Sequence, residues 1–248
     1  MKPALPTLEL QYRRMGNKLP TVEKQMDELY RFERVISTFS PLLTEWFLTS
    51  SKSKEDAWRY KVFEASGTTT AALAVIRERK KGAEDIRSIS IWNGAEVEGD
   101  SAGLTSRCNV LGRPDAFEFG LKLSPEVASW KTGVEWINAA IRIWPALFAT
   151  FGPFWHSEKR VFKDRPGVGW MLYLPRVLTV QQVPEARALV PVTSETNDNT
   201  GKPVQLGTII VSVTDEPFSD ENPEHVKIAN AIEIRLVDQD LLPRYADL

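Results

Sequence analysis

IRSISIWNGAEVEGDSAGLTSRCNVLGRPDAFEFGLKL (residues 86–123) contains three short segments in which apolar and polar residues alternate. The segments are 86–92, 103–110 and 116–123, and Asn93-Gly94 follows the first of them. Alternation with a period of two is typical of a strand with one buried face, and an asparagine–glycine pair marks a turn. The stretch therefore predicts an antiparallel meander of three strands.

Segments on both sides of the meander predict helices and further strands. Apolar residues recur every three or four positions between Pro20 and Pro41, and again over 130–144, as they do on a helix with one buried face. A third helix is predicted over 68–81, and a fourth begins at the capping residue Asn222 and ends near residue 237. The other predicted strands are 8–13, 169–175, 186–192 and 204–214.

This order of elements predicts an α+β fold in which helices pack against mainly antiparallel strands. For 248 residues the usual domain size gives one or two domains, and we expect a single α+β domain over 1–248. A helix followed by strands occurs twice, which also allows two similar lobes, 1–124 and 125–248. Two segments stay ambiguous. Residues 43–48 are a short strand or an extended loop, and IEIRL (232–236) alternates like a strand inside the last predicted helix.

Composition narrows the classes of partner. Lys and Arg number 31 against 33 Asp and Glu, so the basic excess typical of nucleic-acid binders is missing. The single cysteine, Cys108, excludes an intrachain disulfide and favours a reducing compartment. The first residues hold no apolar signal segment, and no run of about 18 apolar residues occurs. We expect a cytoplasmic protein that contacts neither a membrane nor nucleic acid directly.

The motifs that suggest catalysis or cofactor binding are incomplete. Gly167-Val168-Gly169 precedes an apolar strand, whereas a phosphate-binding loop precedes a helix, so a turn is predicted there. His156 and His225 lack partners at metal-ligand spacing. Cys108 lies in an alternating segment and is expected to be a small buried residue. We therefore assign no catalytic residue, no metal ligand and no cofactor.

Acidic residues gather in two segments that are predicted to be loops, GAEVEGD (94–100) and TDEPFSDENPEH (214–225). A pair of carboxylates about 5–10 Å apart across a cleft is the machinery of a glycosidase, whereas carboxylates on an exposed loop complement a basic partner. Tryptophans next to turns add anchors for an interface. The tryptophans are Trp92, Trp155 and Trp170, and the carboxylates are Glu96, Glu98, Asp100, Asp215, Glu216, Asp220 and Glu221.

Four blocks of the sequence together resemble the immunity protein 52 family. They are IWNG (91–94), DRPGVGWMLYLPR (164–176), GTIIVSVTDE (207–216) and NPEHVKIANAIEIRLVDQDLLP (222–243). The resemblance implies a cytoplasmic inhibitor from a bacterial polymorphic-toxin or type VI secretion system. Such a protein binds the toxin encoded by the adjacent gene, often a nuclease with a restriction-endonuclease fold, and blocks it. The resemblance carries over no individual contact residue.

Together these observations predict a binding protein that occludes the active or DNA-binding surface of a secreted nuclease. A nuclease binds phosphates in a positive groove, so we expect the acidic residues of one or both loops to contact it. Two other classes stay open. One is a hydrolase-type enzyme that uses a carboxylate pair, and the other is an adaptor of the secretion machinery.

Overall fold

The computed structural model describes residues 6–50, 53–122, 129–197 and 203–248. Most strands belong to a nine-stranded sheet in which all neighbouring strands are antiparallel, so the predicted α+β fold is confirmed. The strands are β1 (Pro6–Tyr12), β2 (Phe47–Leu48), β3 (Phe63–Glu64), β4 (Gly67–Thr68), β5 (Ile86–Trp92), β6 (Ala102–Asn109), β7 (Asp115–Leu121), β8 (Ala146–Pro153), β9 (Met171–Leu174), β10 (Ala188–Asn197) and β11 (Pro203–Val211).

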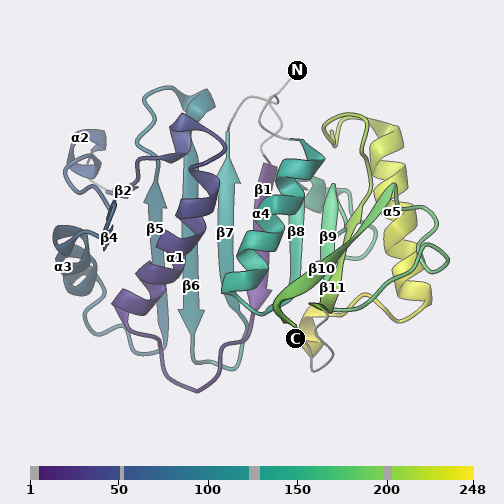
Figure 1. The fold of residues 1–248 in the computed structure, drawn as a ribbon, viewed down its shortest axis with the longest axis horizontal. Helices are drawn as coiled ribbons and strands as arrows, with labels where there is room; N and C mark the ends of the chain where they lie inside the picture. Colours follow the sequence, from purple (N-terminus) through teal and green to yellow (C-terminus); the bar gives the residue numbers. More distant parts are fainter. Residues whose placement is uncertain (1–5, 51–52, 123–128, 198–202) are drawn as a thin grey trace.

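The order of strands in the large sheet is β10-β11-β9-β8-β1-β7-β6-β5-β2 (Figure 1). Strands β5, β6 and β7 form the predicted meander; β5 has the predicted bounds, and those of β6 and β7 differ by one or two residues. The first strand lies in the middle of the sheet, where it pairs with β7 on one side and β8 on the other. Strands β3 and β4 form a separate two-stranded hairpin.

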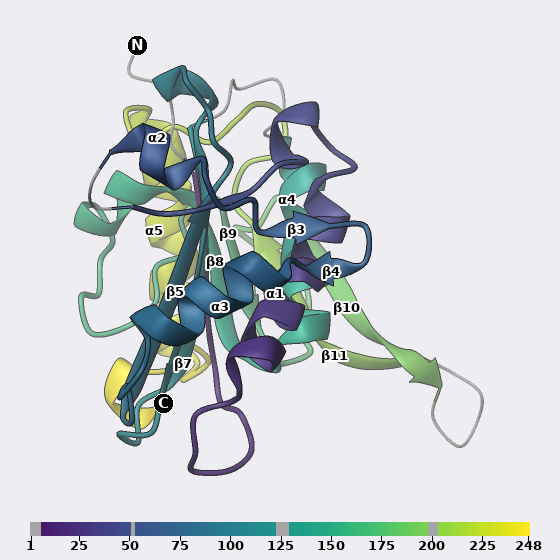
Figure 2. The ribbon, with the colours of Figure 1, turned by 90° about the vertical axis from the view of Figure 1, so that its left-hand side faces the viewer.

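Each longer helix begins at a side chain that accepts a hydrogen bond from its first turn, which satisfies an otherwise unpaired N–H group. These N-caps are Thr21, Thr69, Ser129 and Asn222. The helices are α1 (Val22–Ile36), α2 (Lys54–Ala57), α3 (Thr70–Arg79), α4 (Trp130–Ile143) and α5 (Pro223–Asp238), with short 3-10 helices η1 (Pro41–Leu43), η2 (Glu98–Asp100), η3 (Phe154–Glu158) and η4 (Tyr245–Asp247). Helices α1 and α4 cover one face of the sheet, and α5 covers part of the other face (Figure 2).

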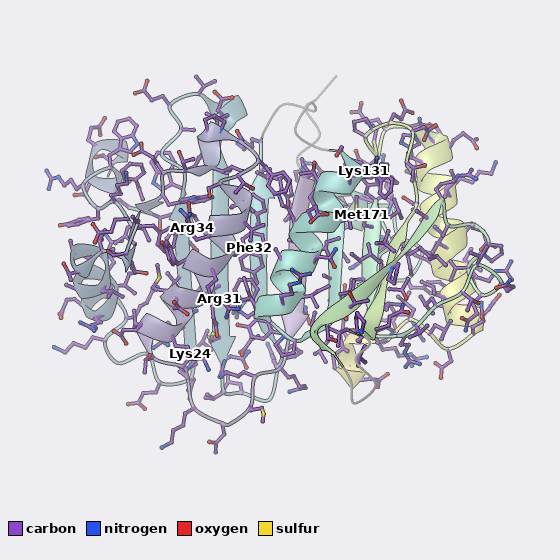
Figure 3. All side chains as sticks on the ribbon, viewed as in Figure 1. Lys24, Arg31, Phe32, Arg34, Lys131 and Met171 are labelled. Atoms are coloured by element: carbon purple, nitrogen blue, oxygen red, sulfur yellow. The ribbon has the colours of Figure 1, made fainter. Side chains whose placement is uncertain are left out.

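The core lies between α1, α4 and the inner face of the sheet. Phe32 of α1 contacts the rings of Phe117 and Phe119 at centroid distances of 4.8 and 5.5 Å. Trp136 of α4 meets Phe119 and Phe151 in the same edge-to-face manner, a geometry that aromatic pairs prefer. Figure 3 shows the labelled Phe32 on α1 among side chains above the strands, while Lys24, Arg31 and Arg34 lie along the same helix. All three of these basic side chains are exposed.

The opposite face of the sheet is covered on one half only. On β9 all four residues are buried, because α4 and α5 enclose this half from both sides. On β5, β6 and β7 buried and accessible residues alternate, so one face of these strands is solvated. The boundary between the two halves runs along β1 and β8.

The structure settles two segments that the sequence left open and shows how a third, the predicted turn, is built. Residues 43–48 contain the end of η1 and then the short strand β2. IEIRL (232–236) is helical, because Ile232, Glu233 and Leu236 lie on the buried face of α5. Gly167-Val168-Gly169 is a loop that leads into β9, as predicted, and Gly169 has a positive φ of 52°.

Candidate partner-binding surface

The two acidic segments leave the sheet at the same edge. Antiparallel pairing makes β5, β8 and β11 run in the same direction, so the loop after β5, the end of β8 and the loop after β11 all lie at one edge of the sheet. Six steps between neighbouring strands separate β5 from β11, or roughly 29 Å at the usual spacing of strands. The predicted acidic residues therefore form two separate groups.

The first group, which we call loop A, comprises residues 94–100. The buried side chain of Asn93 holds this loop by donating to the carbonyls of Leu42 and Asp100 and accepting from the N–H of Ala102. Glu96 is exposed and Asp100 is half-buried. The side chain of Glu98 lies outside the described part of the structure. Val97 is the one large apolar residue that loop A exposes.

The second group, which we call loop B, comprises residues 214–221. His225 of α5 holds this loop: its Nδ1 accepts the N–H of Ser219 at 3.0 Å and its Nε2 lies 2.9 Å from Oε1 of Glu216. Because Nδ1 accepts, the neutral ring carries its proton on Nε2 and donates it to Glu216. Asp215, Glu216 and Glu221 are exposed and Asp220 is half-buried.

Loop B packs against η3. The ring of His156 meets Phe218 edge to face at a centroid distance of 5.1 Å, and Lys159 donates to the carbonyl of Asp220. This contact brings the first residues of η3 to the same surface. Phe154 and Trp155 are 48% and 56% exposed there, although aromatic side chains of this size normally bury most of their area.

A shallow groove along α5 adjoins loop B. Its walls combine Lys159, Asp220 and Glu221 with the outward side of the helix. Apolar residues of that side include Val226, Ala231 and Ile234, and Ile234 is 46% exposed. Loop B, η3 and this groove therefore form one surface that combines carboxylates with exposed aromatic and aliphatic side chains. We call it the loop B surface.

The three tryptophans singled out in the sequence behave differently. Trp170 is buried and its indole N–H donates to the carbonyl of Val213. Trp92 is half-buried and stacks on Trp58 with a centroid distance of 6.2 Å. Trp155 is exposed. Only Trp155 among them is placed to anchor a partner.

A buried carboxylate that the sequence analysis missed positions the segment between η3 and β9. Glu233 of α5 accepts from the N–H groups of Val161 and Val168 at 2.8 and 3.0 Å and is fully buried. Burial raises the pKa of Glu233, and the backbone N–H groups of Val168 and Val161 act in the opposite direction. Glu233 therefore fixes the loop that contains Gly167-Val168-Gly169 to α5.

The other candidate residues, His156 and Cys108, are both buried. Burial lowers the pKa of His156 to about 4, so the ring is neutral at pH 7. Cys108 is buried beside the hydroxyl of Tyr12, and burial raises the pKa of its thiol, which disfavours the nucleophilic thiolate. Among the described residues, no three His, Cys, Asp or Glu side chains are placed to hold a metal ion. No described helix has the length and apolar composition to cross a membrane.

The structure also brings together two carboxylates that lie on strands and not in loops. Glu9 of β1 and Glu118 of β7 are register partners on the solvated face, which places their Cβ atoms about 4.5–5.5 Å apart. Partial desolvation by its surroundings and the charge of Glu118 raise the pKa of Glu9, although its side chain is exposed. The adjoining cavity measures about 70 Å³, room for about three heavy atoms. The pair therefore has no room beside it for a sugar ring.

Comparison with solved structures gives a distant likeness. No protein-family model matches the chain, and no curated protein matches it. Among solved structures, the Pseudomonas aeruginosa T6SS protein PA0821 superposes with a TM-score of 0.48 at 13% identity, over 93% of this chain and 75% of that one. At that distance the likeness carries no argument about what this chain does.

Proposed function

We propose that this chain is a cytoplasmic immunity protein that binds and neutralises a cognate secreted toxin, a nuclease effector of a type VI secretion system. The observation that carries the proposal is the loop B surface, where carboxylates border exposed aromatic side chains. Interfaces are enriched in such aromatic anchors, and charged residues at their rims steer association. The resemblance of four sequence blocks to the immunity protein 52 family supplies the class of partner.

The charge of the loop B surface suits a partner that binds DNA. Asp215, Glu216 and Glu221 are exposed together, whereas a nuclease presents a positive groove to the phosphates of its substrate. Carboxylates that occupy this groove exclude DNA and accelerate encounter. Trp155 and the groove along α5 supply the apolar area that a partner can bury in addition to these charge contacts.

The test is to co-express the chain with the product of the adjacent gene, purify one partner by affinity and assay DNA degradation. We expect a stable complex without nuclease activity, and an affinity that decreases between 50 and 300 mM salt because the contacting charges are screened. A complex that keeps its nuclease activity would contradict inhibition and favour an adaptor. Absence of binding together with full nuclease activity would overturn the proposal.

A further inference from the structure

A cavity of about 70 Å³ lies where the covered and solvated halves of the sheet's outer face meet. Strands β1 and β8 form its floor, and η3, the 160–169 segment and Tyr245 form its walls. Its polar side chains are Thr7, Glu9, Thr150, His156, Ser157 and Arg160.

Two of these side chains hold buried polar atoms that have no hydrogen-bond partner within the described part of the chain. His156 is 4% exposed, yet neither of its ring nitrogens makes a hydrogen bond. Nε of Arg160 is likewise buried without an acceptor. Leaving such groups unpaired costs about 1–3 kcal/mol each, so native proteins rarely keep them without a reason. The neutral imidazole offers one N–H donor and Nε of Arg160 offers a second, and two unpaired donors in one cavity favour a polar ligand that accepts hydrogen bonds.

The charges around the cavity are separated. Glu9 is exposed and its register partner is Glu118, so the mouth is negative. Nε of Arg160 is buried, and its terminal nitrogens donate to the carbonyls of Lys163 and Arg165 and to the hydroxyl of Tyr245. Glu9 and Arg160 attract each other electrostatically but do not form an ion pair. A ligand that carries one positive and one negative charge can contact Glu9 and Arg160 at the same time.

We propose that this cavity binds a small zwitterion of the α-amino acid class, with its carboxylate toward His156 and Arg160 and its ammonium toward Glu9. The carboxylate accepts from the neutral imidazole N–H and from Nε–H of Arg160. The ammonium lies between the carboxylates of Glu9 and Glu118, where it offsets their mutual repulsion. A 150 Å³ cavity holds the six carbons of benzene, so about 70 Å³ takes about three heavy atoms. The carboxylate group therefore enters and the rest of the ligand extends through the mouth.

The orientation also follows from the electrostatics of the two ends. Burial lowers the pKa of His156, Asp220 acts against this, and Lys159, Arg160 and Lys163 act with it. Three cations against one carboxylate favour an anion beside the ring. At the other end, desolvation and the charge of Glu118 raise the pKa of Glu9. A cation beside Glu9 would lower this pKa again. Neither a simple amine nor a simple carboxylate satisfies both ends.

The test is an NMR titration of the chain with glycine and L-alanine, using ethylamine and propionate as probes that carry one charge each. We expect saturable shifts at the 150–169 segment, with the amino acids binding at least tenfold more tightly than either probe. Glu9→Gln should weaken alanine at least tenfold and leave propionate unchanged. Glu84→Gln, an exposed carboxylate without a described contact, is the matched control and should change nothing.

A second variant keeps the inference testable if Glu9→Gln alters the sheet. His156→Phe retains the ring against Phe218 but removes both nitrogens, and it should weaken alanine and propionate together. Absence of saturable binding, or equal affinity for alanine and ethylamine, would overturn the inference. The experiment contains no toxin, so its result is independent of the proposed function.

Discussion

Loops A and B are similar in sequence, because each places three or four carboxylates within eight residues. In the structure they differ in what surrounds them. Loop A is held by Asn93 at the end of its own hairpin and exposes one apolar residue, Val97. Loop B is held by His225 and borders Phe154, Trp155 and the groove along α5. Charge alone therefore does not make a binding surface; the neighbouring apolar side chains decide which loop is suited to a partner.

The largest expected effect is a loss of toxin affinity when the charges of loop B, but not those of loop A, are reversed. The double variant Asp220→Lys/Glu221→Lys should weaken toxin binding by roughly 100-fold, about 2.7 kcal/mol, because two attractions become repulsions. Glu96→Lys/Asp100→Lys changes charge equally in loop A and should alter affinity less than threefold. Affinity and its salt dependence can be measured by surface plasmon resonance. Equal losses for the two double variants would contradict the distinction between the loops.

The free energy of unfolding is expected to depend on pH through His156 of η3, which contacts Phe218 of loop B. Burial lowers the pKa of His156 to about 4, whereas the unfolded value is about 6.5. The unfolded chain therefore gains a proton first as the pH falls, and the free energy of unfolding decreases by about 2.5 kcal/mol between pH 7.5 and 4.5 from this group. Urea unfolding measures it, and His156→Phe should remove this part of the decrease. Parallel curves for both proteins would refute the assignment to His156.

The anchor of loop A should matter for stability and not for binding. Asn93→Ala removes three hydrogen bonds of a buried side chain, and we expect a loss of about 2 kcal/mol in the free energy of unfolding. Toxin affinity at a temperature where the variant stays folded should remain within twofold. Chemical denaturation and surface plasmon resonance give the two quantities. A strong loss of affinity at full folding would show that loop A also contacts the toxin.

The smallest effect concerns the aromatic side chain next to loop B. Trp155→Ala should weaken toxin binding about tenfold, or 1.4 kcal/mol, as is typical of an anchor that becomes buried at an interface. Stability should change by less than about 0.5 kcal/mol because the side chain is exposed. Val97→Ala in loop A, which truncates another exposed apolar residue, is the control. The comparison fails if both substitutions weaken binding alike.

Local patterns predicted much of the fold. The strands β5, β6 and β7 follow directly from alternation, and α5 begins at the expected cap Asn222. Both signals depend only on neighbouring residues, so a single sequence contains them. The position of β1 between β7 and β8 could not be predicted, because it depends on pairing across more than 100 residues.

The candidate site was predictable only in part. Exposed carboxylates on loops 94–100 and 214–221 were expected, yet their separation follows from the order of strands. The pair Glu9 and Glu118 arises from the register of two distant strands. Glu233 resembled a solvated residue in sequence, because nothing local shows that the N–H groups of Val161 and Val168 would meet it inside the protein.

The central position of β1 has a consequence for synthesis in the cell. At about 5–20 residues per second, roughly 5–22 s pass between translation of Tyr12 and translation of Leu121, the last residue of β7. During that time Leu8, Leu10 and Tyr12, all buried in the finished protein, have no sheet to join. An apolar strand without a partner is prone to pair with other chains. The sheet therefore closes late, and its central strand stays without a partner until β7 has been translated.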